Sequence, residues 1–136
     1  MLDELRVAIQ GEDGIVAARQ AAREAARGLG FGPVDQTRIT TAVSELARNV
    51  VRYATGGKGE MRLWSLPVSE RGVGLEILVA DDGPGIEDVK AAMQDGVTSG
   101  MGLGMGLPGA QRLVDELEID SAPGRGTVVT IRKWHR

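Results

Sequence analysis

The sequence predicts an α+β fold, a two-layer sandwich in which helices cover one face of a mostly antiparallel, mixed sheet. The expected elements follow the order β-α-α-β-β-α-α-β-β, which lacks the regular alternation of doubly wound folds. Two strand pairs are joined by short turn segments and therefore form antiparallel hairpins. With 136 residues, 42% of them hydrophobic, the chain is long enough for one domain with its own core and too short for two. We expect a single domain over residues 1–136.

The first half of the chain predicts one strand followed by two helices. Residues 5–9 alternate apolar and polar side chains, as a half-buried strand does, and Gly11 to Gly14 ends that pattern. The stretch from Asp13 to about Leu29 is rich in Ala and Arg, which favour helix. A second helix is expected from Pro33 to about Ala54. Its apolar residues recur at spacings of three and four: Ile39, Val43, Leu46, Val50 and Tyr53.

Two hairpins are expected in the second half. Segments 60–66 and 74–80 are rich in Leu, Val, Ile and Trp, and the residues between them favour a turn, so they predict an antiparallel pair. Residues 117–122 and 127–134 predict a final hairpin that turns at Pro123 to Gly126.

Two helices are expected between these hairpins. The first is a short helix from Ile86 to Met93. A glycine-rich stretch then leads into a second helix, which is expected to hold Pro108 in its first turn and to end near Leu117.

Composition excludes several classes of function. The chain has no cysteine, which removes disulfides, thiolate zinc sites and a cysteine nucleophile. A net charge of −3 with scattered arginines argues against a nucleic-acid surface, so no nucleic-acid partner is expected. No apolar run approaches the roughly 20 residues of a membrane span, and the first ten residues do not resemble a signal peptide. We expect a cytoplasmic protein without a membrane partner.

Glu45 and Asn49 form the first constellation of polar residues. They lie four residues apart in the second helix and are therefore neighbours on one face. Asparagine is a poor residue for a helix interior, which suggests another use for its oxygen, such as binding Mg²⁺. A solvated helix face would explain the same pair.

The segment Asp81-Asp82-Gly83-Pro84-Gly85 ends the most apolar strand. The strand delivers a carboxylate to the edge of the sheet, and the glycines allow a ligand to approach the backbone. Such a carboxylate can accept a hydrogen bond from the exocyclic amine of adenine. A plain polar turn is the alternative.

The glycine-rich segment 99–109 runs directly into a helix. Helix N-termini bind phosphate, so this segment could cover the phosphates of a nucleotide. Gly104, Gly106 and Gly109 match the dinucleotide pattern G-x-G-x-x-G, but no strand precedes them, which disfavours a Rossmann site. No Gly-Lys-Ser/Thr follows, so a Walker A loop is absent. A glycine linker is the remaining alternative.

The ordered motifs together resemble a known family. Glu45…Asn49, Asp81-x-Gly83-x-Gly85, Gly102-x-Gly104-x-Gly106 and Gly124-x-Gly126-Thr127 resemble the N, G1, G2 and G3 boxes of the GHKL (Bergerat-fold) ATPase superfamily. Longer segments resemble the RsbT-type switch serine/threonine kinases of bacterial stressosome modules: VAARQ, GFGPVDQTRITTAVSELARNVVRYA, DDGPGI, GLGMGLPGAQRLVDE and KWHR. This resemblance covers nearly the whole chain and is weakest around residues 56–74.

The resemblance implies an ATP-dependent protein kinase with a defined set of site residues. Glu45 would be the general base, and Asn49 would coordinate Mg²⁺ that bridges the ATP phosphates. Asp81 would recognise adenine, and Thr127 would contact the same base region. The glycines divide between two elements: Gly83 and Gly85 would shape the adenine pocket, and Gly102, Gly104 and Gly106 would belong to a lid over the phosphates.

Partners also follow from the resemblance. Members of this kinase group phosphorylate serine or threonine of STAS-domain proteins, and when released they activate a PP2C-type phosphatase by binding it. The lone His135 lies outside any helical phosphoacceptor motif, so a complete sensor histidine kinase is not expected. An anti-sigma kinase and a nucleotide-dependent binding switch without catalysis are the alternatives. A free-standing ATPase is disfavoured, because no segment resembles a transducer domain.

Overall fold

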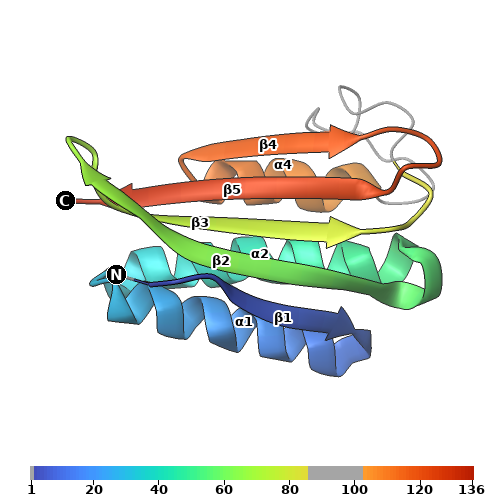
Figure 1. The fold of residues 1–136 in the computed structure, drawn as a ribbon, viewed down its shortest axis with the longest axis horizontal. Coiled ribbons are helices and arrows are strands. Elements are labelled where there is room, and N and C mark those ends of the chain that lie inside the picture. Colours follow the sequence, from blue (N-terminus) through green and yellow to red (C-terminus); the bar gives the residue numbers. More distant parts are fainter. Residues whose placement is uncertain (1, 86–102) are drawn as a thin grey trace.

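The computed structural model describes residues 2–85 and 103–136. The elements along the chain are β1 (Leu5–Gln10), α1 (Gly11–Gly28), α2 (Pro33–Tyr53), the 3₁₀ turn η1 (Thr55–Gly57), β2 (Lys58–Ser69), β3 (Gly72–Asp81), α4 (Leu103–Leu113), β4 (Glu116–Ser121) and β5 (Thr127–His135). They form one sheet with helices packed beside it (Figure 1). The helix expected over 86–93 lies outside the described residues.

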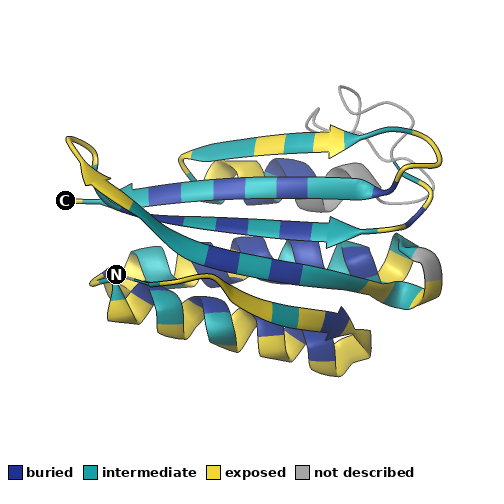
Figure 2. Cartoon of the chain, viewed as in Figure 1, coloured by how far each residue is buried: buried dark blue, intermediate teal, exposed yellow. Residues whose placement is uncertain are grey.

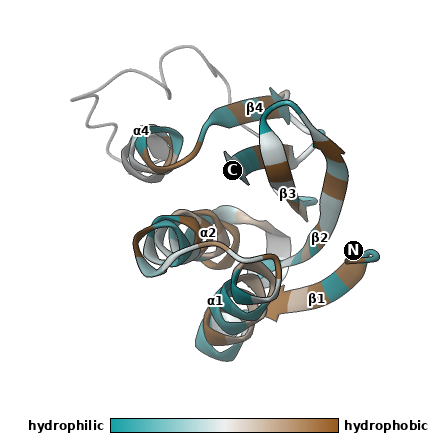
Figure 3. Ribbon diagram, turned by 90° about the vertical axis from the view of Figure 1, so that its left-hand side faces the viewer, coloured by the Kyte–Doolittle hydropathy of each residue, from teal (hydrophilic) through white to brown (hydrophobic). Residues whose placement is uncertain are grey.

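The sheet has the strand order β1-β2-β3-β5-β4, and each pair of neighbours is antiparallel. Seen along the sheet, α1, α2 and α4 all lie on the same side of it (Figure 3). The α+β two-layer sandwich predicted from the sequence is confirmed, and its described strand pairs contain no parallel one.

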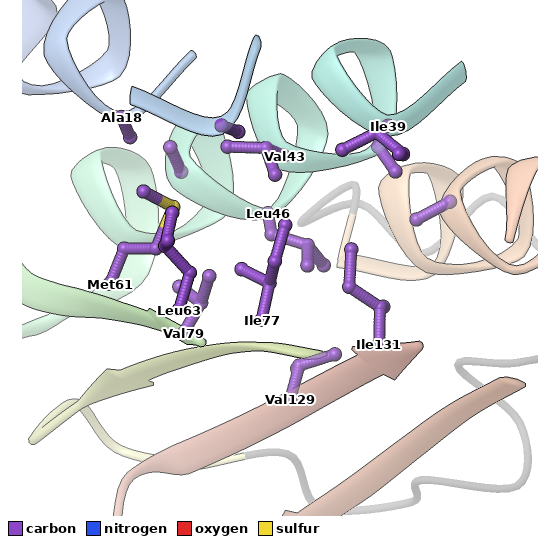
Figure 4. Close-up of a cluster of buried hydrophobic side chains, with 14 of the residues drawn as sticks. Ala18, Ile39, Val43, Leu46, Met61, Leu63, Ile77, Val79, Val129 and Ile131 are labelled. Atoms are coloured by element: carbon purple, nitrogen blue, oxygen red, sulfur yellow. The ribbon is translucent and has the colours of Figure 1, made fainter. Parts of the chain in front are cut away.

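The core lies between the helices and the inner face of the sheet. In α1 the buried positions Ala18, Ala22 and Ala26 recur every four residues, so beyond Ile15 near its start this helix presents small side chains to the core. The larger side chains come from α2 and the central strands (Figure 4). Fully buried examples are Ile39, Val43, Val50, Met61, Leu63, Leu75, Ile77 and Ile131.

Each central strand alternates between its two faces. Along β3 and β5 buried residues alternate with half-buried ones (Figure 2), as the period of two in a strand requires. The buried set faces the helices and includes Ile77, Val79, Val129 and Ile131. The other set faces away from the helices.

A cluster of charges on that outer face, here called the Arg132 cluster, joins β3, β4 and β5. The Arg132 guanidinium donates hydrogen bonds to Glu76, to Glu116 at 3.1 Å and to Glu118 at 3.0 Å. Arg71 donates to Glu116 at 2.9 Å. The hydrogen bonds to the three glutamates raise the pKa of Arg132, and the bond to Glu118 has the largest effect. The pKa of Glu116 is lowered, chiefly by the hydrogen bond from Arg71 and also by that from Arg132.

The predicted pair 60–66 and 74–80 is confirmed, but both strands are longer than expected. Strand β2 continues past Pro67 to Ser69, and its pairing with β3 shifts register between Leu66 and Ser69. Proline cannot donate to a ladder, and such an irregularity is where a strand accommodates it.

The expected bounds of the last helix are wrong. Helix α4 begins at Leu103, so Pro108 lies inside it rather than in its first turn, and it ends at Leu113 rather than near Leu117. Leu107 and Ala110 are buried in the core, which favours helix here despite the glycines. Among the helices that the structure describes, none is long and apolar enough to cross a membrane.

Candidate functional site

Glu45 and Asn49 occupy one side of α2, next to its buried face. Both are partly exposed, while Leu46 and Val50, which directly follow them, are buried. The Glu45 Oε1 atom accepts a hydrogen bond of 2.8 Å from Nη1 of Arg48. Glu45 and Asn49 therefore lie on one face of α2, as their spacing of four predicts.

The C-terminal end of α2 contacts the loop that follows β3. A Cβ atom added at Gly83 would lie 2.8 Å from Cα of Ala54 and 3.1 Å from the carbonyl oxygen of Tyr53. Only glycine allows this approach of two backbones. Asn49 precedes Tyr53 by four residues, about 6 Å of helix rise. The loop thus lies about one helical turn beyond Asn49.

Asp81 ends β3 on the side of the sheet that faces the helices, in phase with the buried Val79 and Ile77. Its Oδ1 atom accepts a hydrogen bond of 2.8 Å from the backbone N–H of Gly83. Burial is the largest cause of a raised pKa at this carboxyl, and the charge of Asp82 adds to it. Backbone donation from Gly83 and Thr127 opposes the rise in pKa.

Two glycines with positive φ hold the loop after β3 against the β4–β5 turn. Gly85 has φ +80° and Gly126 has φ +78°. A Cβ atom at Gly85 would overlap the carbonyl oxygen of Ala122, and one at Gly126 would overlap that of Asp81. The backbone N–H of Gly124 also donates to the Pro84 carbonyl at 2.7 Å. These contacts require glycine at both positions.

Thr127 begins β5 directly opposite Asp81. The Thr127 Oγ1 atom lies 2.8 Å from Oγ of Ser121, which donates to the Gly126 carbonyl at 2.9 Å. The predicted turn motif Gly124-x-Gly126-Thr127 therefore places Thr127 beside Asp81 at the end of β3.

Sequence reasoning missed Gly59 and Ser121. Gly59 pairs with Asp81 across β2 and β3, and a Cβ there would lie 2.5 Å from the Ala80 carbonyl oxygen and 2.7 Å from Cγ1 of Val50. The only sequence signal was the Gly56-Gly57-Lys58-Gly59 run, which by itself indicates no more than a turn. The register of the two strands was needed to bring Gly59 to the site.

The glycines predicted to form a lid do not all lie in a loop. Gly104 and Gly106 belong to α4, and Gly102 lies outside the described residues. Their proposed contact with phosphate remains a prediction.

The site therefore combines a half-buried carboxylate, close-packed glycine backbone and, one helical turn away, the amide of Asn49. Gly83, Gly85 and Gly126 let the backbones of Ala54, Ala122 and Asp81 pack closely around the carboxylate, which a side chain at any of the three would prevent. The amide oxygen of Asn49 is a ligand type that Mg²⁺ accepts together with phosphate oxygens. Among residues 2–85 and 103–136 there is no group of three or more His, Cys, Asp or Glu that could hold a metal.

Comparison with known proteins identifies the family to which the chain belongs. The family described as "Histidine kinase-like ATPase domain" matches residues 12–133, which include all the motifs above. The serine/threonine-protein kinase RsbT of Bacillus subtilis is 50% identical over 137 residues, covering 100% of both chains. An anti-sigma F factor of Caldanaerobacter subterraneus is 38% identical over 100 residues, covering 71% of this chain and 68% of the relative.

A similar anti-sigma F factor from Thermoanaerobacter sp. is 36% identical over 99 residues, with 71% of this chain and 68% of the relative covered. Among solved structures, the mycobacterial sensor histidine kinase MprB superposes with a TM-score of 0.60 at 16% identity. That match covers 100% of this chain and 99% of the other, and it supports the fold alone. The family match and the full-length identity agree with the resemblance found in the motifs. The chain belongs to the histidine kinase-like ATPase domain family, and within it to the serine/threonine-protein kinases of the RsbT type.

Proposed function

We propose that residues 1–136 form a single ATP- and Mg²⁺-dependent kinase domain that phosphorylates serine or threonine of STAS-domain proteins. The observation that carries this proposal is Asp81. Its carboxylate lies at the end of a central strand, is partly removed from water, and accepts hydrogen bonds from backbone N–H groups in a loop that close-packed glycines shape. Identity of 50% along the whole length of a serine/threonine-protein kinase supports the same function.

Recognition of the nucleotide base is assigned to the end of β3. The ionised Asp81 accepts a hydrogen bond from the exocyclic amine of adenine, while Gly83 and Gly85 shape the loop that borders the base. Thr127, opposite Asp81, contributes its hydroxyl to the same region. Burial raises the pKa of Asp81, which is the cost of keeping this acceptor away from water.

Phosphate binding is assigned to α2 and to the glycine-rich segment. Asn49 holds Mg²⁺ through its amide oxygen, and the metal when bound neutralises charge on the phosphates. Gly104 and Gly106, near the start of α4, are assigned to the phosphates through backbone N–H groups at the helix N-terminus, and Gly102 belongs to the same sequence motif.

Glu45 acts on the acceptor hydroxyl. In the proposed step the hydroxyl proton moves to the Glu45 carboxylate while the acceptor oxygen forms a bond to the γ-phosphorus. The bond from that phosphorus to the β–γ bridging oxygen breaks, which gives a phosphoserine or phosphothreonine and ADP. Phosphoryl transfer needs chiefly positioning and charge neutralisation, so two polar residues on one helix face are sufficient for this part of the chemistry.

The proposal extends to the biological setting. We infer a cytoplasmic partner-switching pathway of the stressosome type, in which the phosphorylated STAS-domain protein releases the kinase. The released kinase then binds and activates a PP2C-type phosphatase. Similarity to both a serine/threonine-protein kinase and anti-sigma F factors supports a role in exchange between protein partners.

The test is incubation of the purified chain with γ-labelled ATP, Mg²⁺ and a STAS-domain protein from the same genome. We expect label on serine or threonine of the partner with wild type, and none with Asn49→Ala. Glu45→Ala should bind ATP normally and lose transfer. Nucleotide binding without transfer by wild type, with normal partner binding, would identify a binding switch instead.

A second candidate, an anti-sigma kinase, is favoured by the 36% and 38% identities to anti-sigma F factors. Those matches cover 71% of this chain, whereas the match to the serine/threonine-protein kinase covers all of it. A pull-down that retains a sigma factor and no phosphatase would favour this second candidate.

A further inference from the structure

Arg48 is a charged residue within the candidate site to which the proposed function gives no role. It lies on α2 between Glu45 and Asn49, and its Nη1 atom donates the 2.8 Å hydrogen bond to Oε1 of Glu45. The two side chains are 38% and 36% exposed. The guanidinium therefore occupies one of the two oxygens of the proposed general base.

This pair differs from the other ion pairs with the same spacing in the described helices. Arg38 and Asp35 in α2 lie 3.2 Å apart, with 51% and 26% of their side chains exposed. Arg27 and Glu24 in α1 lie 3.5 Å apart, with 70% and 75% exposed. Pairs that are so exposed contribute little, because water and salt screen them. The Arg48–Glu45 pair has the shortest contact of the three, and its guanidinium is the least exposed, so it restrains its carboxylate more strongly.

We propose that Arg48 is a positioning residue that fixes the Glu45 carboxylate for proton transfer. The inference rests on the proposed role of Glu45. With Oε1 held by Arg48, the second oxygen of the carboxylate is the one that takes the proton of the acceptor hydroxyl.

The physical need for such a residue follows from the Glu45 side chain. Glutamate has three side-chain torsions, and a partly exposed one samples many orientations unless a partner holds it. Misplacing a reacting group by about 1 Å can cost on the order of 100-fold in rate. Arginine suits this task because its planar guanidinium loses less freedom per hydrogen bond than other long side chains.

The experiment compares Arg48→Ala and Arg48→Lys with wild type in the γ-labelled ATP assay with a STAS-domain acceptor. Arg38→Ala is the matched control, because it removes an ion pair of the same spacing from the same helix. We expect Arg48→Ala to lower kcat about tenfold while KM for ATP changes less than twofold. Arg48→Lys should recover most of the loss, and Arg38→Ala should keep the wild-type kcat.

A double variant separates positioning from a general effect on the helix. If Arg48 acts through Glu45, Arg48→Ala should cause no further loss in a Glu45→Gln background. Wild-type kcat in Arg48→Ala, or the same tenfold loss with and without Glu45, would overturn the inference while leaving the kinase assignment intact. No transfer by wild type, in contrast, would overturn the kinase assignment and this inference together.

Discussion

Carboxylates at two places on the sheet have different hydrogen-bond donors and opposite pKa shifts. In the Arg132 cluster on the outer face, Glu76, Glu116 and Glu118 all accept hydrogen bonds from one guanidinium. Asp81, on the inner face at the end of β3, is held by backbone N–H groups and is near a second carboxylate. The pKa of Glu116 is lowered, and that of Asp81 is raised.

We infer from this difference that the Arg132 cluster contributes to stability and that Asp81 serves ligand binding. Carboxylates paired with a cation are stabilised in their charged form and favour the folded state. A desolvated carboxylate without that compensation is less favourable to the fold, but it is a strong acceptor for a ligand that can donate to it. Variants in the two regions should therefore have opposite profiles of stability and ATP affinity.

The largest loss of stability and of ATP binding is expected for a substitution at Gly126, whose backbone packs against Asp81. Gly126→Ala places a Cβ against the Asp81 carbonyl at a positive φ, so it should destabilise the protein by about 3 kcal/mol or more and abolish ATP binding. Thermal unfolding and nucleotide titration measure both.

Gly124→Ala is the matched control for that variant. Gly124 has φ +79° in the same turn but nothing within 4 Å of its Cβ position. It should cost only about 1 kcal/mol, which is the effect of the positive φ alone. Equal losses in the two variants would show that close approach to Asp81 is unimportant.

The next largest effect is expected for Asp81→Asn. Replacing the charged acceptor should weaken ATP binding more than tenfold, or about 1.4 kcal/mol. Thermal stability at neutral pH should be unchanged or higher, because the variant removes a desolvated charge. Isothermal titration and thermal unfolding give the two values, with Glu76→Gln as the contrasting variant that loses stability and keeps affinity. Unchanged ATP affinity in Asp81→Asn would refute the adenine assignment.

Lowering the pH should weaken ATP binding gradually, as Asp81→Asn does, because it protonates the Asp81 carboxylate. The folded pKa of Asp81 is raised, so its protonation begins at a higher pH than for an ordinary aspartate, and it removes the acceptor without destabilising the fold. Glu116 has a lowered folded pKa, so the stability it contributes is present above its unfolded pKa and is lost as pH falls through the folded pKa. ATP affinity should therefore decline before thermal stability does. The opposite order would contradict this comparison.

The smallest effect is expected in the Arg132 cluster. Arg132→Met keeps the aliphatic bulk but leaves three carboxylates without their shared donor, which should cost about 1 kcal/mol of stability. ATP affinity should stay within twofold of wild type. Unfolding at low and high salt, with Arg125→Met as the control from an exposed single pair, measures the difference.

The sequence predicted the order of the described elements because their apolar residues follow clear periods. The positions of Ile39, Val43, Leu46 and Val50 on one face of α2 are an example, since burial alone determines them. Boundaries near Pro108 were wrong because local propensity disfavours a helix that contains glycines and proline, whereas burial of Leu107 and Ala110 favours it. Helix propensity can be judged from neighbouring residues in the sequence, whereas burial depends on the tertiary structure.

Much of the candidate site could also be predicted, since Asp81, Gly83, Gly85 and Thr127 lie in motifs that the fold brings together. Gly59 could not be found, because its role depends on the register that places it opposite Asp81. The role of Arg48 as a partner of Glu45 also required side-chain coordinates, because a spacing of three on a helix permits a contact without specifying it.

The order of strands in the sheet has a consequence for synthesis of the protein on the ribosome. Strand β5 follows β4 along the chain but lies between β3 and β4, so the described sheet is incomplete until residues 127–135 have left the ribosome. Thr127, which pairs with Asp81, belongs to that last strand. A nascent chain that lacks β5 exposes an unpaired edge of β3 and cannot form the proposed adenine site. Nucleotide binding should therefore begin only after translation of β5.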